Sequence, residues 1–237
     1  MLKPDGATCT TATQCSSGIC TGNLCVPPPC AYATSTVYSG VTYPLVNIGT
    51  KCWFAKNLNV GTRLTYSTYP SNNSLIEKWC YSNSEANCTT YGGLYTWAEA
   101  NQLATTCNSN FCTPSSPSQG ICPSGWHIPT DTEIQTLEIY LGMCAGTGTG
   151  CAGASAQLRG TDQGTKLKSG GSSGFNLLLG GGIQYGSFAA LGSGAYLWSA
   201  SESAAQSAYM RSFSAGAQIN RYGDTKSHGS SVRCLKN

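Results

Sequence analysis

Charged side chains are scarce in this chain: lysine, arginine, aspartate and glutamate make up 10% of its 237 residues. The few charges are scattered and leave a formal net charge of +3, with no run of lysine or arginine to neutralise a phosphate backbone. We therefore expect no nucleic-acid partner. A run of roughly 18 apolar residues is also missing, so we expect no membrane span in this chain.

The usual ligands of a structural zinc site are few as well. Histidine occurs only at His127 and His228, and no two of the 14 cysteines have the C-x2-C spacing of zinc sites. Fourteen cysteines, an even number, instead predict a disulfide framework formed in an oxidising compartment. We expect a secreted or cell-surface protein with no bound metal.

The start of the chain, Met1-Leu2-Lys3-Pro4, lacks the apolar segment of a signal peptide. We expect a mature form or an excised ectodomain, with its signal or anchor missing from this chain. Two N-glycosylation acceptor patterns, Asn72-Asn73-Ser74 and Asn87-Cys88-Thr89, are interpreted as markers of surface loops.

The chain has two regions that differ in composition. Residues 1–30 hold five cysteines at near-even spacing and are too short to build an apolar core. They predict a small disulfide-rich module that ends in a stiff, proline-rich stalk at Val26–Pro29. Residues 31–237 predict one domain of the α+β class.

Spacing alone does not fix which cysteines pair in residues 1–52. Our working assignment there is Cys9–Cys20, Cys15–Cys25 and Cys30–Cys52. Three further pairs would close short loops: Cys80–Cys88, Cys107–Cys112 and Cys144–Cys151. The remaining pair, Cys122–Cys234, would tie the middle of the chain to its last strand.

The larger domain is predicted to contain two helices and several short antiparallel strands. Helices are expected at Tyr95–Ala104 and Asp131–Leu141, the second starting with a capping box between Thr130 and Glu133. Val41–Ile48 and Lys51–Leu58 predict a hairpin. Beyond Gly142 we expect no helix, only strands separated by Gly/Ser turns: Phe175–Leu179, Gly182–Leu191, Ala195–Ala200, Ala208–Phe213, Gln218–Arg221 and Ser230–Leu235.

Five segments, taken together, resemble the sequence pattern of a known family. They are Asn47–Leu58 (NIGTKCWFAKNL), Tyr91–Ala100 (YGGLYTWAEA), Ile121–Asp131 (ICPSGWHIPTD), Ala195–Glu202 (AYLWSASE) and Ser230–Cys234 (SSVRC). In this order, over about residues 38–236, the chain resembles the Fibrobacter succinogenes major paralogous domain. The small N-terminal module lies outside the resemblance.

That family is similar to the C-type lectin fold, in the branch shared with formylglycine-generating enzymes and the variable proteins of diversity-generating retroelements. The resemblance implies a domain whose C-terminal strands and loops present a ligand surface. It also supports the Cys122–Cys234 bridge. This sequence departs from the family pattern at Cys52 and by insertions around Cys107–Cys112 and Cys144–Cys151, which affects loop shapes rather than the fold.

The sequence gives little support for an enzyme activity. Gly170–Gly174 matches G-x-S-x-G literally, but it follows Lys166-Leu167-Lys168 and reads as a flexible loop rather than a strand-to-helix elbow. His127 is interpreted as a packed structural residue and His228 as exposed in a Ser/Gly loop. All cysteines can pair, which leaves no reactive thiol of the kind used by the formylglycine-generating relatives. We expect no enzyme activity.

No cofactor is expected. Calcium is the one ion left open, because the fold class includes calcium-dependent sugar-binding proteins. The E-P-N-like and W-N-D-like triplets of those lectins are absent. Glu202, Asn220 and Asp224 are the oxygen ligands that could converge on such an ion.

The segment Ser203–Ser227 separates two anchored stretches and is predicted to carry the binding surface. Strand alternation places Met210, Ser212 and Ser214 on one face, opposite Tyr209, Arg211 and Phe213. A tyrosine with Ser, Asn and Asp neighbours offers rigid contact area and adaptable hydrogen bonds, as in antibody loops. The expected contact residues are Met210, Ser212, Ser214, Ala217, Asn220, Tyr222, Asp224 and His228.

The sequence thus predicts an extracellular, ligand-binding, adhesion-type display protein whose partner is an unknown cell-surface protein or glycan. A sharper hypothesis makes the C-terminal positions targets of retroelement mutagenesis. The alternative is a structural subunit that assembles into a surface filament or envelope structure, with the small module as spacer or contact.

Overall fold

The computed structural model describes residues 1–71, 73–155 and 157–237. The glycosylation pattern that begins at Asn72 therefore starts outside the described residues. All 14 cysteines are paired, and the seven bonds are those assigned from the sequence. The chain is a mixed α+β protein in which sheets predominate.

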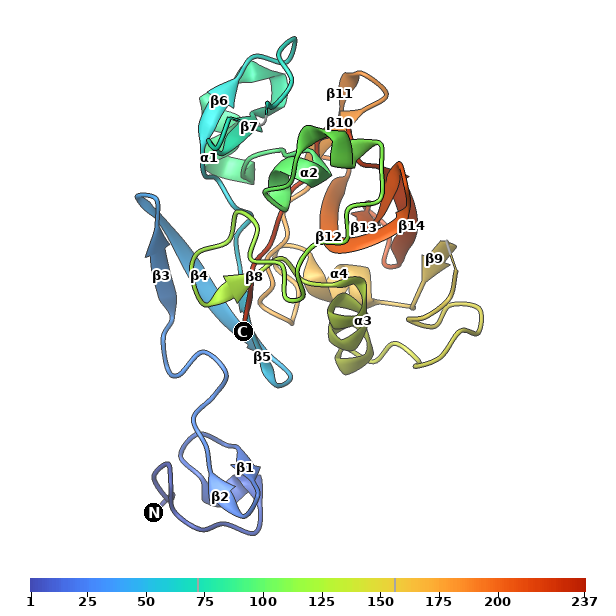
Figure 1. The fold of residues 1–237 in the computed structure, drawn as a ribbon. Helices are drawn as coiled ribbons and strands as arrows, with labels where there is room; N and C mark the ends of the chain where they lie inside the picture. The colour runs from blue at the N-terminus through green and yellow to red at the C-terminus, as the bar shows by residue number, and fades with distance from the viewer. Residues whose placement is uncertain (72, 156) are drawn as a thin grey trace.

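Residues 1–30 project from one end of the protein (Figure 1). They contain a short 3-10 turn and a hairpin: η1 (Ala12–Gln14), β1 (Cys20–Thr21) and β2 (Leu24–Cys25). The bonds Cys9–Cys20 and Cys15–Cys25 supply the interior of this unit, whose buried residues are cysteines. Cys30–Cys52 ties it to the rest of the chain.

The first sheet of the larger domain has five strands and brings the two ends of that domain together. Its order is β3 (Ser35–Tyr38), β4 (Val41–Ile48), β5 (Lys51–Phe54), β15 (Leu235–Lys236) and β8 (Trp126–His127). The predicted hairpin is present, although β5 ends at Phe54 instead of Leu58. Of the expected strand Ser230–Leu235, only its last residue lies in β15, and Ser230 and Ser231 make isolated bridges.

The second sheet has six strands and dominates the C-terminal half (Figure 1). Its order is β11 (Ser187–Leu191), β10 (Gly180–Gln184), β12 (Ala195–Ala204), β13 (Ser207–Phe213), β14 (Ile219–Thr225) and β9 (Gln157–Arg159). All its pairings are antiparallel except β10 with β12. A separate parallel pair is formed by β6 (Thr62–Leu64) and β7 (Glu77–Trp79).

Four α-helices occur among the described residues: α1 (Glu85–Tyr91), α2 (Trp97–Ala100), α3 (Asp131–Tyr140) and α4 (Gln163–Leu167). The predicted capping box of α3 is confirmed, with Thr130 accepting from the backbone N–H of Glu133. The predicted helix Tyr95–Ala104 is reduced to the four residues of α2. The expectation of no helix beyond Gly142 is wrong, because α4 lies there. The predicted strand Phe175–Leu179 is only a bridge at Leu177.

The second sheet separates two halves of the core. Trp198 and Met210 point into one cluster of buried side chains. Leu197 and Phe213, their neighbours by strand alternation, pack in the other cluster against Ile134 of α3. Both faces of β12 and β13 are therefore buried at this level, and any exposed surface must lie further along the strands.

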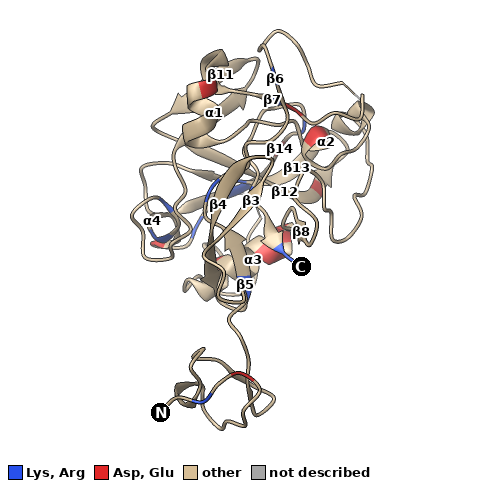
Figure 2. Ribbon diagram, turned by 90° about the vertical axis from the view of Figure 1, so that its left-hand side faces the viewer, with Lys and Arg blue, Asp and Glu red and all other residues tan. Residues whose placement is uncertain are grey.

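Charged residues occupy few positions of the ribbon and are distributed over several elements (Figure 2). Among residues 1–71, 73–155 and 157–237 there is no helix with the length and apolar character needed to cross a bilayer.

Candidate functional site

One face of the second sheet is partly open to solvent near the turn between β13 and β14. Tyr196 of β12, Ser212 of β13, Asn220 of β14 and Leu158 of β9 are consecutive register partners, so their side chains share a face. The first three are half-buried, and Leu158 is 56% exposed. We call the following residues the open face: Leu158, Tyr185, Tyr196, Ser212, Asn220 and Tyr222.

The next row of the same face leads into the core. Trp198, Met210 and Tyr222 are register partners, and Met210 has no exposed surface. The prediction that Met210 contacts a ligand is therefore corrected: strand alternation gave its face correctly, but that face is covered at its position. Tyr222 is half-buried at the boundary between the core and the open face.

Two phenols of this face, those of Tyr196 and Tyr222, have raised pKa values. Burial, and then the nearby Asp224 carboxylate, raise the pKa of Tyr222 and also that of Tyr196. Each protonated phenol can both donate and accept a hydrogen bond.

Asp224 and His228 do not reach the solvent as predicted; they are 6% and 8% exposed. His228 Nδ1 lies 3.1 Å from both carboxylate oxygens of Asp224, and its Nε2 accepts the backbone N–H of Tyr185 at 3.2 Å. Because Nε2 is an acceptor, the ring proton resides on Nδ1 and is donated to Asp224. The pair is a support for Tyr185 and not a free acid or base.

Tyr185 itself is 90% exposed, and its ring meets the ring of His228 edge-on, with the centroids 5.1 Å apart. It lies in the hairpin turn between β10 and β11. The buried pair Asp224–His228 thus holds an exposed aromatic side chain at the rim of the open face.

The turn between β13 and β14 is restrained by a lysine side chain. Lys168 Nζ donates to the carbonyl oxygens of Ser214, Ala215 and Gly216 at 2.8, 2.9 and 2.7 Å. Ser214 is exposed and Ala217 is half-buried. These two predicted contact residues therefore sit in a restrained turn at the edge of the open face.

Of the eight predicted contact residues, three belong to the open face (Ser212, Asn220, Tyr222), two to the adjoining turn, and three are buried. The prediction missed Leu158, Tyr185 and Tyr196, which precede the segment on which it concentrated. Only Tyr185 left a recognisable signal, an aromatic residue in the run Gln-Tyr-Gly-Ser. The predicted strand Gly182–Leu191 passed through this run, but the structure turns there between β10 and β11.

The back of the sheet is fixed by a buried ion network that ties β9, β13 and β14 to α3. Arg211 bridges Asp131 (Nη1 to Oδ1, 2.7 Å) and Glu138 (Nε to Oε1, 2.6 Å). Arg221 binds the other Asp131 oxygen at 2.7 Å, and Arg159 binds Glu138 at 2.8 Å. All five residues are at most 7% exposed.

Two of the three residues expected to hold calcium, Glu202 and Asp224, are engaged with other groups of the protein. Glu202 accepts from Lys226 Nζ at 2.5 Å and from the backbone N–H groups of Cys112 and Thr113 at 3.0 Å. Asp224 accepts from His228.

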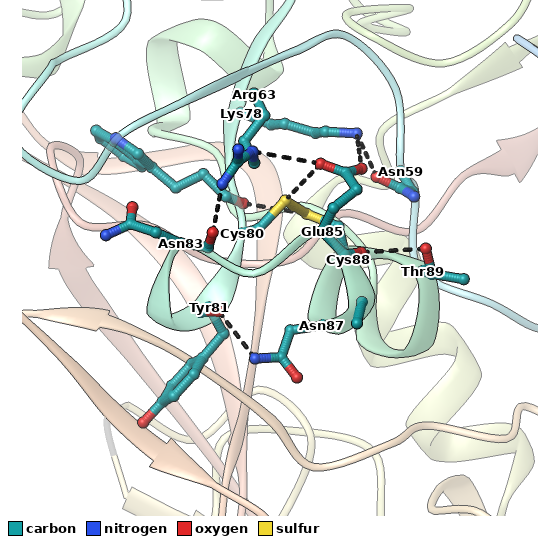
Figure 3. The surroundings of a disulfide bond; sticks show 12 residues. Asn59, Arg63, Lys78, Cys80, Tyr81, Asn83, Glu85, Asn87, Cys88 and Thr89 are labelled. Carbon is teal, nitrogen blue, oxygen red and sulfur yellow. Dashed lines mark hydrogen bonds and ion pairs between the residues drawn. A yellow bond between two sulfur atoms is a disulfide. The ribbon is translucent and has the colours of Figure 1, made fainter.

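In the described part of the chain, one cluster of mixed metal-ligating types occurs, and it surrounds a disulfide (Figure 3). The Cys80 and Cys88 sulfurs are bonded to each other, and the Glu85 carboxylate beside them faces Lys78 and Arg63, each at 3.5 Å. Lys78 Nζ also donates to Asn59. With its sulfurs bonded and its carboxylate paired to two cations, this cluster braces the start of α1.

The fold and the site define a disulfide-stapled α+β domain whose C-terminal sheet presents an uncharged, tyrosine-containing face. The chain belongs to the Fibrobacter succinogenes major domain family, whose model matches residues 46–236. No curated protein and no solved structure matches this chain.

Proposed function

We propose that this chain is an extracellular ligand-binding protein of the adhesion type, with the open face as its recognition surface. The observation that carries the proposal is Tyr185, a 90% exposed aromatic side chain held by the buried pair Asp224–His228. Rigid, exposed tyrosines are favoured contact residues because they bury much area for little conformational entropy.

The scaffold supports the same proposal. The ion network fixes the back of the sheet, Lys168 fixes its turn, and seven disulfides hold the loops. A face that is rigid before binding loses less entropy on association. The disulfides favour an extracellular setting, since such bonds persist in oxidising compartments.

A C-type lectin-like fold is part of the proposal. The long bridge Cys122–Cys234 and the ligand face on the C-terminal strands are both features that the family resemblance implies. Diversification by a retroelement would fall on Ser212 and Asn220 of the open face and on Ser214 of its turn. We propose no catalytic role, because both ring nitrogens of His228 are engaged and every cysteine is paired.

The proposal is tested by blocking the open face. The double variant Leu158→Ser/Ser212→Lys removes an exposed apolar contact and places a charged chain at the centre of the row. It is expected to weaken binding by roughly tenfold or more. Binding is measured on a glycan array and by pulldown of surface proteins.

The matched control is Leu75→Ser/Ser67→Lys, which makes the same changes at exposed positions of the β6–β7 connection; Leu75 is 59% exposed. The control should bind like the parent. Equal binding by both double variants would place the recognition surface elsewhere.

A further inference from the structure

The backbone of Tyr185 is strained. Gln184 and Ser187 are register partners, so Tyr185 and Gly186 form a two-residue hairpin turn, with φ values of 47° and 76°. Positive φ at both central residues is the pattern of a type I′ turn, in which Asn or Gly is strongly preferred at the first position. A bulky residue there is an outlier that points to function, because the 90% exposed ring gains almost no burial in return.

The open face carries no exposed charge. Asp224 is the carboxylate nearest to the tyrosines and is buried against His228. Arg211 and Arg221 belong to the same strands but point to the opposite face, into the ion network. A charged ligand would find no group of opposite charge on this surface. An uncharged ligand would cover the surface without burying an unpaired charge.

The polar side chains of the open face are hydroxyls and one amide: those of Tyr185, Tyr196, Tyr222, Ser212 and Asn220. A hydroxyl group can both donate and accept a hydrogen bond. A ligand rich in hydroxyls can therefore pair with this set of groups.

The shape of the face favours a narrow ligand. Four of its six residues (Tyr196, Ser212, Asn220 and Tyr222) are half-buried, which leaves a strip with exposed side chains at its two ends, Leu158 and Tyr185. A typical protein partner covers about 800 Å² on each side. A sugar chain is narrower, carries hydroxyls along its length, and presents C–H groups whose partial positive charge is attracted to the face of a tyrosine ring.

We propose that the open face binds an uncharged, hydroxyl-rich glycan chain and that Tyr185 is its main stacking residue. This inference rests on the proposed recognition role of the open face. The strained turn keeps Tyr185 in place for that contact, with Asp224 and His228 as positioning residues behind it.

The test compares Tyr185→Asn with Tyr185→Phe on an array of neutral hexose oligosaccharides and their sialylated and sulfated counterparts. Asparagine suits the turn, so Tyr185→Asn should raise the thermal midpoint by about 2–3 °C. It should also weaken binding to neutral glycans by more than roughly tenfold. Tyr185→Phe keeps the ring and should bind within about threefold of the parent.

A lower thermal midpoint in Tyr185→Asn, or undiminished glycan binding, would overturn the role given to Tyr185. Binding by the parent only to charged glycans or to proteins, still lost in Leu158→Ser/Ser212→Lys, would overturn the ligand class and leave the proposed function standing. Binding that neither face variant disturbs would overturn both.

Discussion

Replacing Cys122 and Cys234 together with alanine is expected to lower the free energy of unfolding by about 4–5 kcal/mol. The bond spans 112 residues of sequence and joins two side chains that are 1% and 0% exposed in the core. Chain-entropy estimates give the largest stabilisation to the longest closed loop. A loss of this size would consume much of the stability of about 5–15 kcal/mol that is typical of a domain.

The matched control is removal of Cys107–Cys112, which spans only five residues. The same estimate gives a loss of about 2 kcal/mol. Chemical unfolding of both oxidised double variants would measure the difference. Equal losses would contradict the view that the long bridge is the main staple of the C-terminal half.

Removing the Asp131 charge by Asp131→Asn is expected to cost about 3–5 kcal/mol, because breaking a buried ion network leaves uncompensated charge. Asp131 is the carboxylate shared by Arg211 and Arg221, which hold β13 and β14 to α3. The control is Asp162→Asn, whose side chain is 53% exposed and pairs with Lys166 on the surface. Exposed pairs typically contribute less than about 1 kcal/mol, so a comparable loss in the two variants would be the contrary result.

Acid unfolding gives an independent readout of the same network. Burial opposes the charged form of Asp131, but the hydrogen bonds and charges of Arg221 and Arg211 outweigh it and lower its pKa to about 2. A depressed carboxyl pKa stabilises the folded state above the ordinary value of 3.8, and that contribution is lost as the pH falls through about 2.

The thermal midpoint of the parent should therefore fall between about pH 4 and pH 2, and the fall should be shallower in Asp131→Asn. Some slope remains in the variant. Burial also opposes the charge of Glu133, but its hydrogen bonds to His127 and Thr130 lower its pKa to about 2 as well. Identical slopes in the two proteins would mean that Asp131 is not held as an ion by the arginines.

Features set by local chemistry could be predicted from the sequence. The capping box of α3 needs only Thr130 and Glu133 at the right spacing, and the hairpin of β4 and β5 needs only strand formers around Gly49. Short cysteine loops such as Cys80–Cys88 have few alternative partners nearby. These signals act over a few residues and survive in almost any tertiary setting.

Short elements stabilised by distant contacts were missed or misjudged. Helix α4 has five residues, too few for an apolar period, and depends on the backbone of Gly164 donating to Ala217 and on buried Leu167. Phe175–Leu179 has the composition of a strand, but only Leu177 finds a bridge partner. A sequence pattern reflects which secondary structure its residues prefer. It cannot show which residues from elsewhere in the chain lie beside the segment.

The same difference between local and distant contacts applies to the candidate site. Alternation put Met210 and Ser212 on one face correctly, yet it could not tell that the core covers Met210. It also could not tell that β13 ends at Phe213, which leaves Ser214 exposed in the following turn. His228 looked exposed because its neighbours are Ser and Gly, but Asp224 and the Tyr185 backbone enclose it. Burial of a polar side chain depends on partners that are remote in sequence.

The central claim is that a rigid scaffold presents a face whose side chains can change without loss of the fold. It is tested most directly by a library randomised at Leu158, Tyr185, Ser212, Ser214 and Asn220. We predict that most members keep a thermal midpoint within about 5 °C of the parent while their ligand binding varies widely. A library in which most members unfold, or in which all folded members bind alike, would contradict the claim.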